Sequence, residues 1–235
     1  MSARTAGARH FHLELAEFKS RLLEMSGLAE DQVRMAVEAF LDSNVGMAAE
    51  VIVRDKRVDE LELVLDKAAH ELLALQQPMA GDLRFITMAM KIANDLERVG
   101  DHAVNIARAV QVMAEMLPTG RAPEVVEMAR LARRMLDDAL DCFVQGDPDA
   151  AREVCAADDR VDHLHDSVFR ILLTHMMEDP RWIGPSMSLL LISKNLERIA
   201  DLATNIAEDV VFMVEGVVIK HPGKGHGGEP AVSAT

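Results

Sequence analysis

The sequence predicts an all-α protein built from two tandem three-helix bundles that are related by pseudo-two-fold symmetry. The first observation is composition: apolar residues make up 49% of the 235 residues, aromatic residues only 3%, and there is no Tyr. A core of Ala, Leu, Val, Ile and Met suits close helix–helix packing, whereas β-rich chains usually contain more aromatic and β-branched residues. The second observation is an internal repeat.

Two blocks of the first half recur in the same order in the second half. Residues 48–62 (AAEVIVRDKRVDELE) share 8 of 15 positions with residues 151–165 (AREVCAADDRVDHLH), at an offset of 103. Residues 94–108 (NDLERVGDHAVNIAR) share 8 of 15 with residues 194–208 (KNLERIADLATNIAE), at an offset of 100. Two independent matches in one order indicate a duplication.

Helix punctuation divides each half into three helices. Asn44 and Asp147, which are related by the offset of 103, are good N-cap residues, and Pro148 suits a first helical position. Pro78 and the segment 180–185 interrupt the chain before each third helix. We therefore expect helices near 9–42, 44–76 and 79–116, then near 123–144, 147–178 and 185–216. The corresponding units are residues 1–118 and 122–220, followed by a disordered Gly-rich tail at 221–235.

The third helix of each unit carries a heptad seam, with steps that alternate between 3 and 4 residues. The first seam is Ala89, Ile92, Leu96, Val99, Ala103, Ile106, Val110 and Met113, and the second is Leu189, Ile192, Leu196, Ile199, Ala203, Ile206, Val210 and Met213.

Charge and cysteine usage exclude several classes of protein. The formal net charge is −14, which disfavours binding to a nucleic-acid backbone because that binding depends on clustered Lys and Arg. Cys142 and Cys155 form no CxxC motif, so we expect reduced thiols. No apolar run reaches membrane-spanning length and no signal-peptide segment is present. We expect a soluble cytoplasmic protein that reaches a membrane only indirectly.

Acidic stripes run along the third helix of each half. Glu97 and Asp101 are spaced i, i+4, and Glu197 and Asp201 repeat the pattern. At about 100° per residue, the stripe lies about 175° from the apolar seam, so we expect it to face outward from its own bundle. Like charges at this spacing cost a helix about 0.2–0.5 kcal/mol per pair, and bridging by a hard cation would offset that cost.

The middle helices carry a second stripe, which we expect on the flank of each bundle. Its metal-capable residues are Asp55, Asp59 and Glu62 in the first half and Asp158, Asp162 and His165 in the second. The exchange of Glu62 for His165 keeps a ligand for iron, zinc or manganese, but not for calcium or magnesium.

A simpler interpretation also fits the stripes, because acidic helix faces are commonly just solvated or paired with arginines such as Arg98 and Arg198. The recurrence of the pattern in both halves favours the metal hypothesis. His102 has Leu202 as its counterpart, which favours a packing or surface role over a metal role, and Trp182 in its Pro-rich connector is interpreted as a packing plug.

The segments 76–107 (QQPMAGDLRFITMAMKIANDLERVGDHAVNIA) and 189–210 (LLLISKNLERIADLATNIAEDV) resemble the two signature segments of the PhoU family of phosphate-uptake regulators. The resemblance covers about residues 10–220. It implies multinuclear metal clusters, of iron, zinc or a similar metal, held by E/DxxxD motifs at the bundle surface. On this chain these motifs are Glu97/Asp101, Asp55/Asp59, Glu197/Asp201 and Asp158/Asp162.

The resemblance also implies a role. Members repress phosphate-starvation signalling and restrain the high-affinity phosphate ABC transporter through its ATPase and a sensor histidine kinase, commonly as dimers. No catalysis is implied. The second half departs from the family pattern at Ala200 and Leu202, where the family has Gly and His, so its site is expected to differ.

Two alternatives remain open at the level of sequence. A di-iron carboxylate oxidase needs inward-facing Glu residues and paired Glu-x-x-His motifs, of which the chain has none. A helical scaffold unrelated to phosphate, with or without bound metal, is the other alternative.

Overall fold

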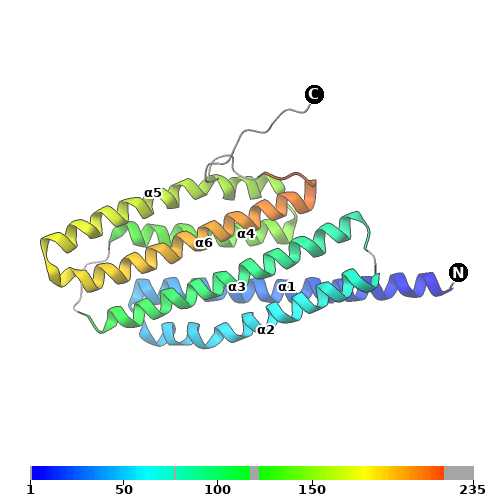
Figure 1. Cartoon of the computed structure of the whole chain (residues 1–235), viewed down its shortest axis with the longest axis horizontal. Coiled ribbons are helices and arrows are strands. Elements are labelled where there is room, and N and C mark those ends of the chain that lie inside the picture. The colour runs from blue at the N-terminus through cyan, green and yellow to red at the C-terminus, as the bar shows by residue number, and fades with distance from the viewer. Residues whose placement is uncertain (1, 77, 117–121, 220–235) are drawn as a thin grey trace, which may run out of the picture.

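The computed structural model describes residues 2–76, 78–116 and 122–219. The predicted tail at 221–235 and most of the connector between the halves lie outside these residues. Six long helices and one short 3₁₀ helix follow in the order α1 (Ser2–Asp42), α2 (Val45–Gln76), α3 (Ala80–Ala114), α4 (Pro123–Gln145), α5 (Pro148–Glu178), η1 (Pro180–Trp182) and α6 (Ile183–Glu215). The predicted all-α class is confirmed, and all six long helices run along the long axis of the molecule (Figure 1).

One predicted helix start was wrong. Helix α1 begins at Ser2 rather than near residue 9, because no proline interrupts the polar N-terminal segment. Helix α6 begins at Ile183, within two residues of the predicted start near 185, and it accommodates Pro185 because a proline in the first turn removes only an N–H that has no intrahelical partner.

The turns between the first and second helices show the same design in both halves. The Asp147 side chain accepts hydrogen bonds from the N–H groups of Asp149 and Ala150, as predicted for an N-cap. The predicted cap Asn44 likewise accepts one from the backbone N–H of Met47, at 3.0 Å. The residue before each cap is left-handed, with φ of 53° at Ser43.

The halves are stacked, with α1 to α3 in one layer and α4 to α6 in the other (Figure 1). The α3 and α6 helices pack against each other where the layers meet, so the apolar core continues from one half into the other. Every seam residue is buried apart from the partly buried Met113 and Met213, which confirms the heptad prediction. This packing fixes how far the acidic faces of α3 and α6 stand from α2 and α5.

Packing contacts account for two residues that the sequence singled out, one between the layers and one within the second half. His102 on α3 lies with its Nδ1 atom 2.9 Å from Oδ1 of Asn195 on α6, so it serves the interface between the halves. Trp182 packs its ring 5.2 Å from that of His175, at the end of α5. Both residues have packing roles, as expected.

Candidate metal centre

The acidic stripes of α5 and α6 meet in the groove between these helices. One ligand atom from each of Asp158, Asp162 and Asp201 lies within 4.8 Å of the other two. Asp158 is only 4% exposed, which is unusual for an aspartate. We call these three residues, with His165 and Glu197, the second cluster.

Glu197 and His165 belong to this cluster through their electrostatic effects. Burial raises the pKa of Glu197, and the Asp201 carboxylate raises it further, whereas Arg198 and His165 act in the opposite direction. The Arg198 Nη1 atom donates a hydrogen bond to Asp201 Oδ2 at 3.0 Å. The second cluster therefore combines carboxylates with an imidazole and has a guanidinium at its edge.

The corresponding stripes of α2 and α3 also face each other, and we call Asp55, Asp59, Glu62, Glu97 and Asp101 the first cluster. Burial raises the pKa of Glu97, and the other four carboxylates raise it further. Burial also raises the pKa of Asp55, with added repulsion from Asp59 and Asp101. All five carboxylates thus lie close enough to repel one another.

The arginines Arg98 and Arg198 occupy equivalent positions in the two halves but form different ion pairs. Arg98 pairs with Asp95, at 3.4 Å from Oδ1, which lies outside the first cluster. Arg198 pairs with Asp201 of the second cluster instead. Among the residues that the structure describes, only the second cluster brings three donors within 4.8 Å of one another. The cation that acts on the first cluster is Arg108, which favours the ionised form of Asp55.

The structure changes the predicted orientation of the stripes. Asp101 is exposed, but Glu97 and Glu197 are half-buried, so the third-helix stripe is not on a fully solvated far side. The reason is that α2 and α5 turn their own stripes toward α3 and α6, and the facing carboxylates cover one another. Each half holds one acidic groove between two helices.

Gln32 on α1 is the residue that sequence reasoning missed. Its side chain is 2% exposed, and its Nε2 atom donates a hydrogen bond to Asp55 Oδ1 at 3.1 Å. No motif marks this position. The one available signal was a polar residue at a buried position of an amphipathic helix whose counterpart at the offset of 103 is Met135.

The donor sets fit divalent transition metals. Metal–oxygen and metal–nitrogen bonds of about 2.0–2.2 Å place two opposite donors slightly more than 4 Å apart, close to the 4.8 Å limit met by the second cluster. The His165 Nδ1 atom is buried without a hydrogen-bond partner, and a neutral imidazole is a common metal ligand. The residues of the second cluster are therefore compatible with a bound cation.

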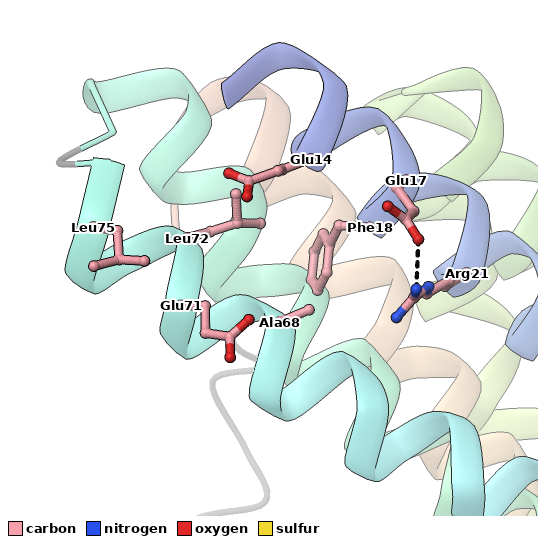
Figure 2. A pocket seen from close by; sticks show the side chains of 8 residues that line it. All are labelled: Glu14, Glu17, Phe18, Arg21, Ala68, Glu71, Leu72 and Leu75. Carbon is pink, nitrogen blue, oxygen red and sulfur yellow. Dashed lines mark hydrogen bonds and ion pairs between the residues drawn. The ribbon is translucent and has the colours of Figure 1, made fainter. Parts of the chain in front are cut away.

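Two further hollows in the described part of the chain contain no activated nucleophile. Figure 2 shows the groove between α1 and α2, where Phe18 and Leu72 lie between Glu14 and Glu71 and where Arg21 donates to Glu17. No Ser, Cys or His lines this groove. A second hollow, between α4 and α5, contains the buried Cys142, the pKa of which is raised by burial, so its thiol is not activated. No described helix has the length and apolar character needed to span a membrane.

The PhoU domain matches this chain twice, at residues 22–110 and 125–210, which together cover most of its length. The chain belongs to the PhoU family. Curated relatives include the phosphate-specific transport system accessory protein PhoU homologues of Zymomonas mobilis and Rhizobium meliloti. The first is 39% identical over 206 residues and the second 41% identical over 207, and each alignment covers 88% of this chain and 87% of the relative.

Solved structures of PhoU proteins have the same fold. PhoU from Pseudomonas aeruginosa superimposes with a TM-score of 0.84 at 38% identity, over 88% of this chain and all of that one. The phosphate transport system regulatory protein PhoU from Streptococcus pneumoniae gives a TM-score of 0.81 at 28% identity, over 90% of this chain and all of that one. Together with the double domain match, these structures confirm the predicted pair of three-helix bundles.

Proposed function

We propose that this PhoU-family protein restrains phosphate uptake and phosphate-starvation signalling as a metal-binding adaptor. Its relatives are named as accessory proteins of the phosphate-specific transport system, and a role in regulating phosphate transport follows from that kinship. The observation that carries the metal-binding part is the meeting of two acidic stripes in the same groove of each half.

In this proposal each cluster holds a multinuclear centre of iron, zinc or manganese. Asp55, Asp59, Glu62, Glu97 and Asp101 are the ligands in the first half. Asp158, Asp162, His165, Glu197 and Asp201 are the ligands in the second. Bound cations neutralise carboxylates that otherwise repel one another, and they join α2 to α3 and α5 to α6 across the grooves. The metal then stabilises the surface that a partner recognises.

An exposed apolar surface beside the second cluster supports the adaptor role. It lies on either side of the α5–α6 turn and consists of Phe169, Leu173 and Met177 on α5 and Ile183, Met187 and Leu191 on α6. Phe169 follows Asp162 by seven residues, or two helical turns, so both lie on one face of α5. We call this set the α5/α6 apolar surface.

The duplication provides an internal control for this surface. The counterparts in the first half, at offsets of 103 and 100, are Asp66, His70, Ala74, Leu83, Thr87 and Lys91. Four of these six are polar or charged. The first half exposes Leu75, Met79 and Leu83 at its own turn, but it lacks the apolar residues at these four positions, so they are not a requirement of the shared fold. Contiguous exposed apolar side chains commonly mark a protein interaction site.

We assign the α5/α6 apolar surface to the ATPase of the phosphate ABC transporter, because the relatives of this chain are named as accessory proteins of the phosphate-specific transport system. The proposal also includes a cytoplasmic location, contact with a sensor histidine kinase and a homodimeric state. A helical scaffold that binds metal but has no link to phosphate is the alternative.

Elemental analysis of the purified full chain tests the metal-binding part. The protein is stripped with a chelator, reconstituted separately with iron, zinc and manganese, and freed of excess metal. We expect stoichiometric metal that falls when Glu97→Gln and Asp101→Asn disable the first cluster. The control is Glu60→Gln with Glu71→Gln, which removes two carboxylates of α2 that lie outside the cluster. Equal metal content in both variants would contradict the proposed ligands.

A pull-down from phosphate-replete and phosphate-starved cells tests the adaptor part, with the transporter ATPase and the kinase as the proteins assayed. Phe169→Asp with Leu173→His gives the apolar surface the residues of the first half, and we expect loss of the ATPase. The control Leu63→Asp replaces another exposed apolar residue with that of its own counterpart, Asp166. Recovery of the ATPase by the double variant would reject this surface as the docking site.

A further inference from the structure

Gln32 is a buried polar residue in an otherwise apolar stretch of α1. Its side chain is 2% exposed, and its Oε1 atom is buried without a hydrogen-bond partner. A buried carbonyl left unsatisfied costs about 1–3 kcal/mol, and a methionine of similar size would avoid that cost. The second half has Met135 at the equivalent position, also 2% exposed. We therefore expect the polar side chain of Gln32 to make an interaction that exists only in the first half.

The amide of Gln32 is directed at Asp55 of the first cluster. Its Nε2 atom donates to Asp55 Oδ1 at 3.1 Å, which holds one oxygen of that carboxylate and leaves Oδ2 outside this hydrogen bond. Both side chains also border Gly100 on α3, because a Cβ added to Gly100 would lie 2.9 Å from Asp55 Oδ1 and from Gln32 Oε1. The amide and the carboxylate thus meet against the bare backbone of α3.

Gly100 and Gln32 change together between the halves. The counterpart of Gly100 is Ala200, which is fully buried, and Ala200 occurs where the first helix offers Met135 instead of an amide. A Cβ at position 100 would occupy the space that the amide and the carboxylate share. Gln32 therefore explains why the Leu-Glu-Arg-Val-Gly-Asp segment has a glycine at position 100. The missing side chain of Gly100 leaves the space in which the Gln32 amide reaches Asp55.

We propose that Gln32 is a positioning residue for the first metal cluster, holding Asp55 through one oxygen so that the other is presented to a cation. The inference rests on the proposed metal binding and specifies how one half achieves it. Ligating carboxylates are commonly oriented by such a hydrogen bond, and loss of that bond typically weakens metal binding by about 10–100-fold. In the second half, where the helix offers only Met135, Asp158 is not oriented in this way.

Mn²⁺ titration of the full chain tests the proposal. The parent protein carries Asp162→Asn and Asp201→Asn, which disable the second cluster, and it is compared with the same protein carrying Gln32→Met, the residue of the second half. The free Mn²⁺ is followed by its electron paramagnetic resonance signal. The control is Ser26→Ala, because Ser26 is also buried and polar on α1 but bonds only the Leu22 carbonyl of its own helix.

We expect Gln32→Met to raise the Kd for Mn²⁺ by about 10–100-fold and to alter the spectrum of the bound ion. Ser26→Ala should leave both unchanged, even where the two variants lower the Tm of the metal-free protein equally. A Kd within twofold of the parent in Gln32→Met would overturn the assignment while leaving metal binding intact. Absence of Mn²⁺ uptake by the parent would overturn the inference about the first cluster, and absence of iron, zinc and manganese alike from the reconstituted unmodified protein would overturn the proposed metal binding.

Discussion

Replacement of Gly100 by Ala tests how tightly the first cluster is built. The added Cβ would lie 2.9 Å from Asp55 Oδ1 and 2.9 Å from Gln32 Oε1, closer than real Cβ atoms approach such neighbours. Both atoms end flexible side chains, so the contact is relieved when the Gln32 amide turns away, which breaks its hydrogen bond to Asp55. We expect Gly100→Ala to destabilise the metal-free protein.

The magnitude follows from two opposing effects. A hydrogen bond to a charged group contributes about 1.5–3 kcal/mol, whereas Ala is favoured over Gly in a helix interior by about 1 kcal/mol. The free energy of unfolding should therefore fall by about 0.5–2 kcal/mol, which for a chain of this length lowers the Tm by roughly 1–8 °C. When Gln32→Met has already removed the amide, Gly100→Ala should be neutral or stabilising by up to about 1 kcal/mol.

Urea denaturation of the unmodified protein, the two single variants and the double variant completes a double-mutant cycle in the presence of a chelator. We expect a coupling energy of about 1.5–3 kcal/mol between positions 32 and 100. The same change in stability for Gly100→Ala in both backgrounds, with coupling below about 0.5 kcal/mol, would refute the account of Gly100.

Three further predictions concern single positions elsewhere. Ser43→Gly, the residue of its counterpart in the second half, should raise the free energy of unfolding by about 1 kcal/mol because φ at this position is 53°. Burial, with the added charge of Glu30, raises the pKa of Asp137 from 3.8 to about 6. Ionisation of Asp137 above pH 6 therefore disfavours the folded state. At pH 8 we expect Asp137→Asn to unfold at a higher urea concentration than the unmodified protein. The gain in the free energy of unfolding should be about 1 kcal/mol, because the Asp137 side chain is 34% exposed and solvent weakens the effect. This gain should shrink between pH 6 and pH 4 and disappear at lower pH, where Asp137 is protonated in both states. Arg198→Ala should strengthen Mn²⁺ binding at the second cluster about 1.5–5-fold, measured by the same method in a protein whose first cluster is disabled by Glu97→Gln and Asp101→Asn, and unchanged binding would argue against its pairing with Asp201.

The helices and their seams could be predicted because each depends on neighbours in the chain. The cap at Asp147 needs only the next turn of backbone, and the heptad seam needs only the spacing of its apolar residues. The start of α1 could not be placed in the same way, since Ser2 and Thr5 are both suitable N-cap residues and no proline selects between them. Helix ends without such signals are the least determined features of a sequence.

The sequence could predict which acidic residues share one stripe, but not which other helix that stripe faces. Spacing along one helix places Glu97 and Asp101 on a common face, but it says nothing of the helix opposite. That the α2 stripe faces the α3 stripe depends on how α3 is rotated when it packs against α1, α2 and α6 at once. Gln32 was missed for the same reason, because its link to Asp55 spans 23 residues and joins two helices.

Duplication gave both halves the same acidic grooves, and later substitutions separated their electrostatics. The first cluster consists of carboxylates alone, with an amide that fixes Asp55. The second replaces one carboxylate with His165 and pairs Asp201 with Arg198, so its donors lie close together before any cation binds. A cation at the first cluster therefore relieves more repulsion, whereas one at the second must displace the Arg198 ion pair. In the proposed function, the Arg198 ion pair therefore lies in the same half as the α5/α6 apolar surface.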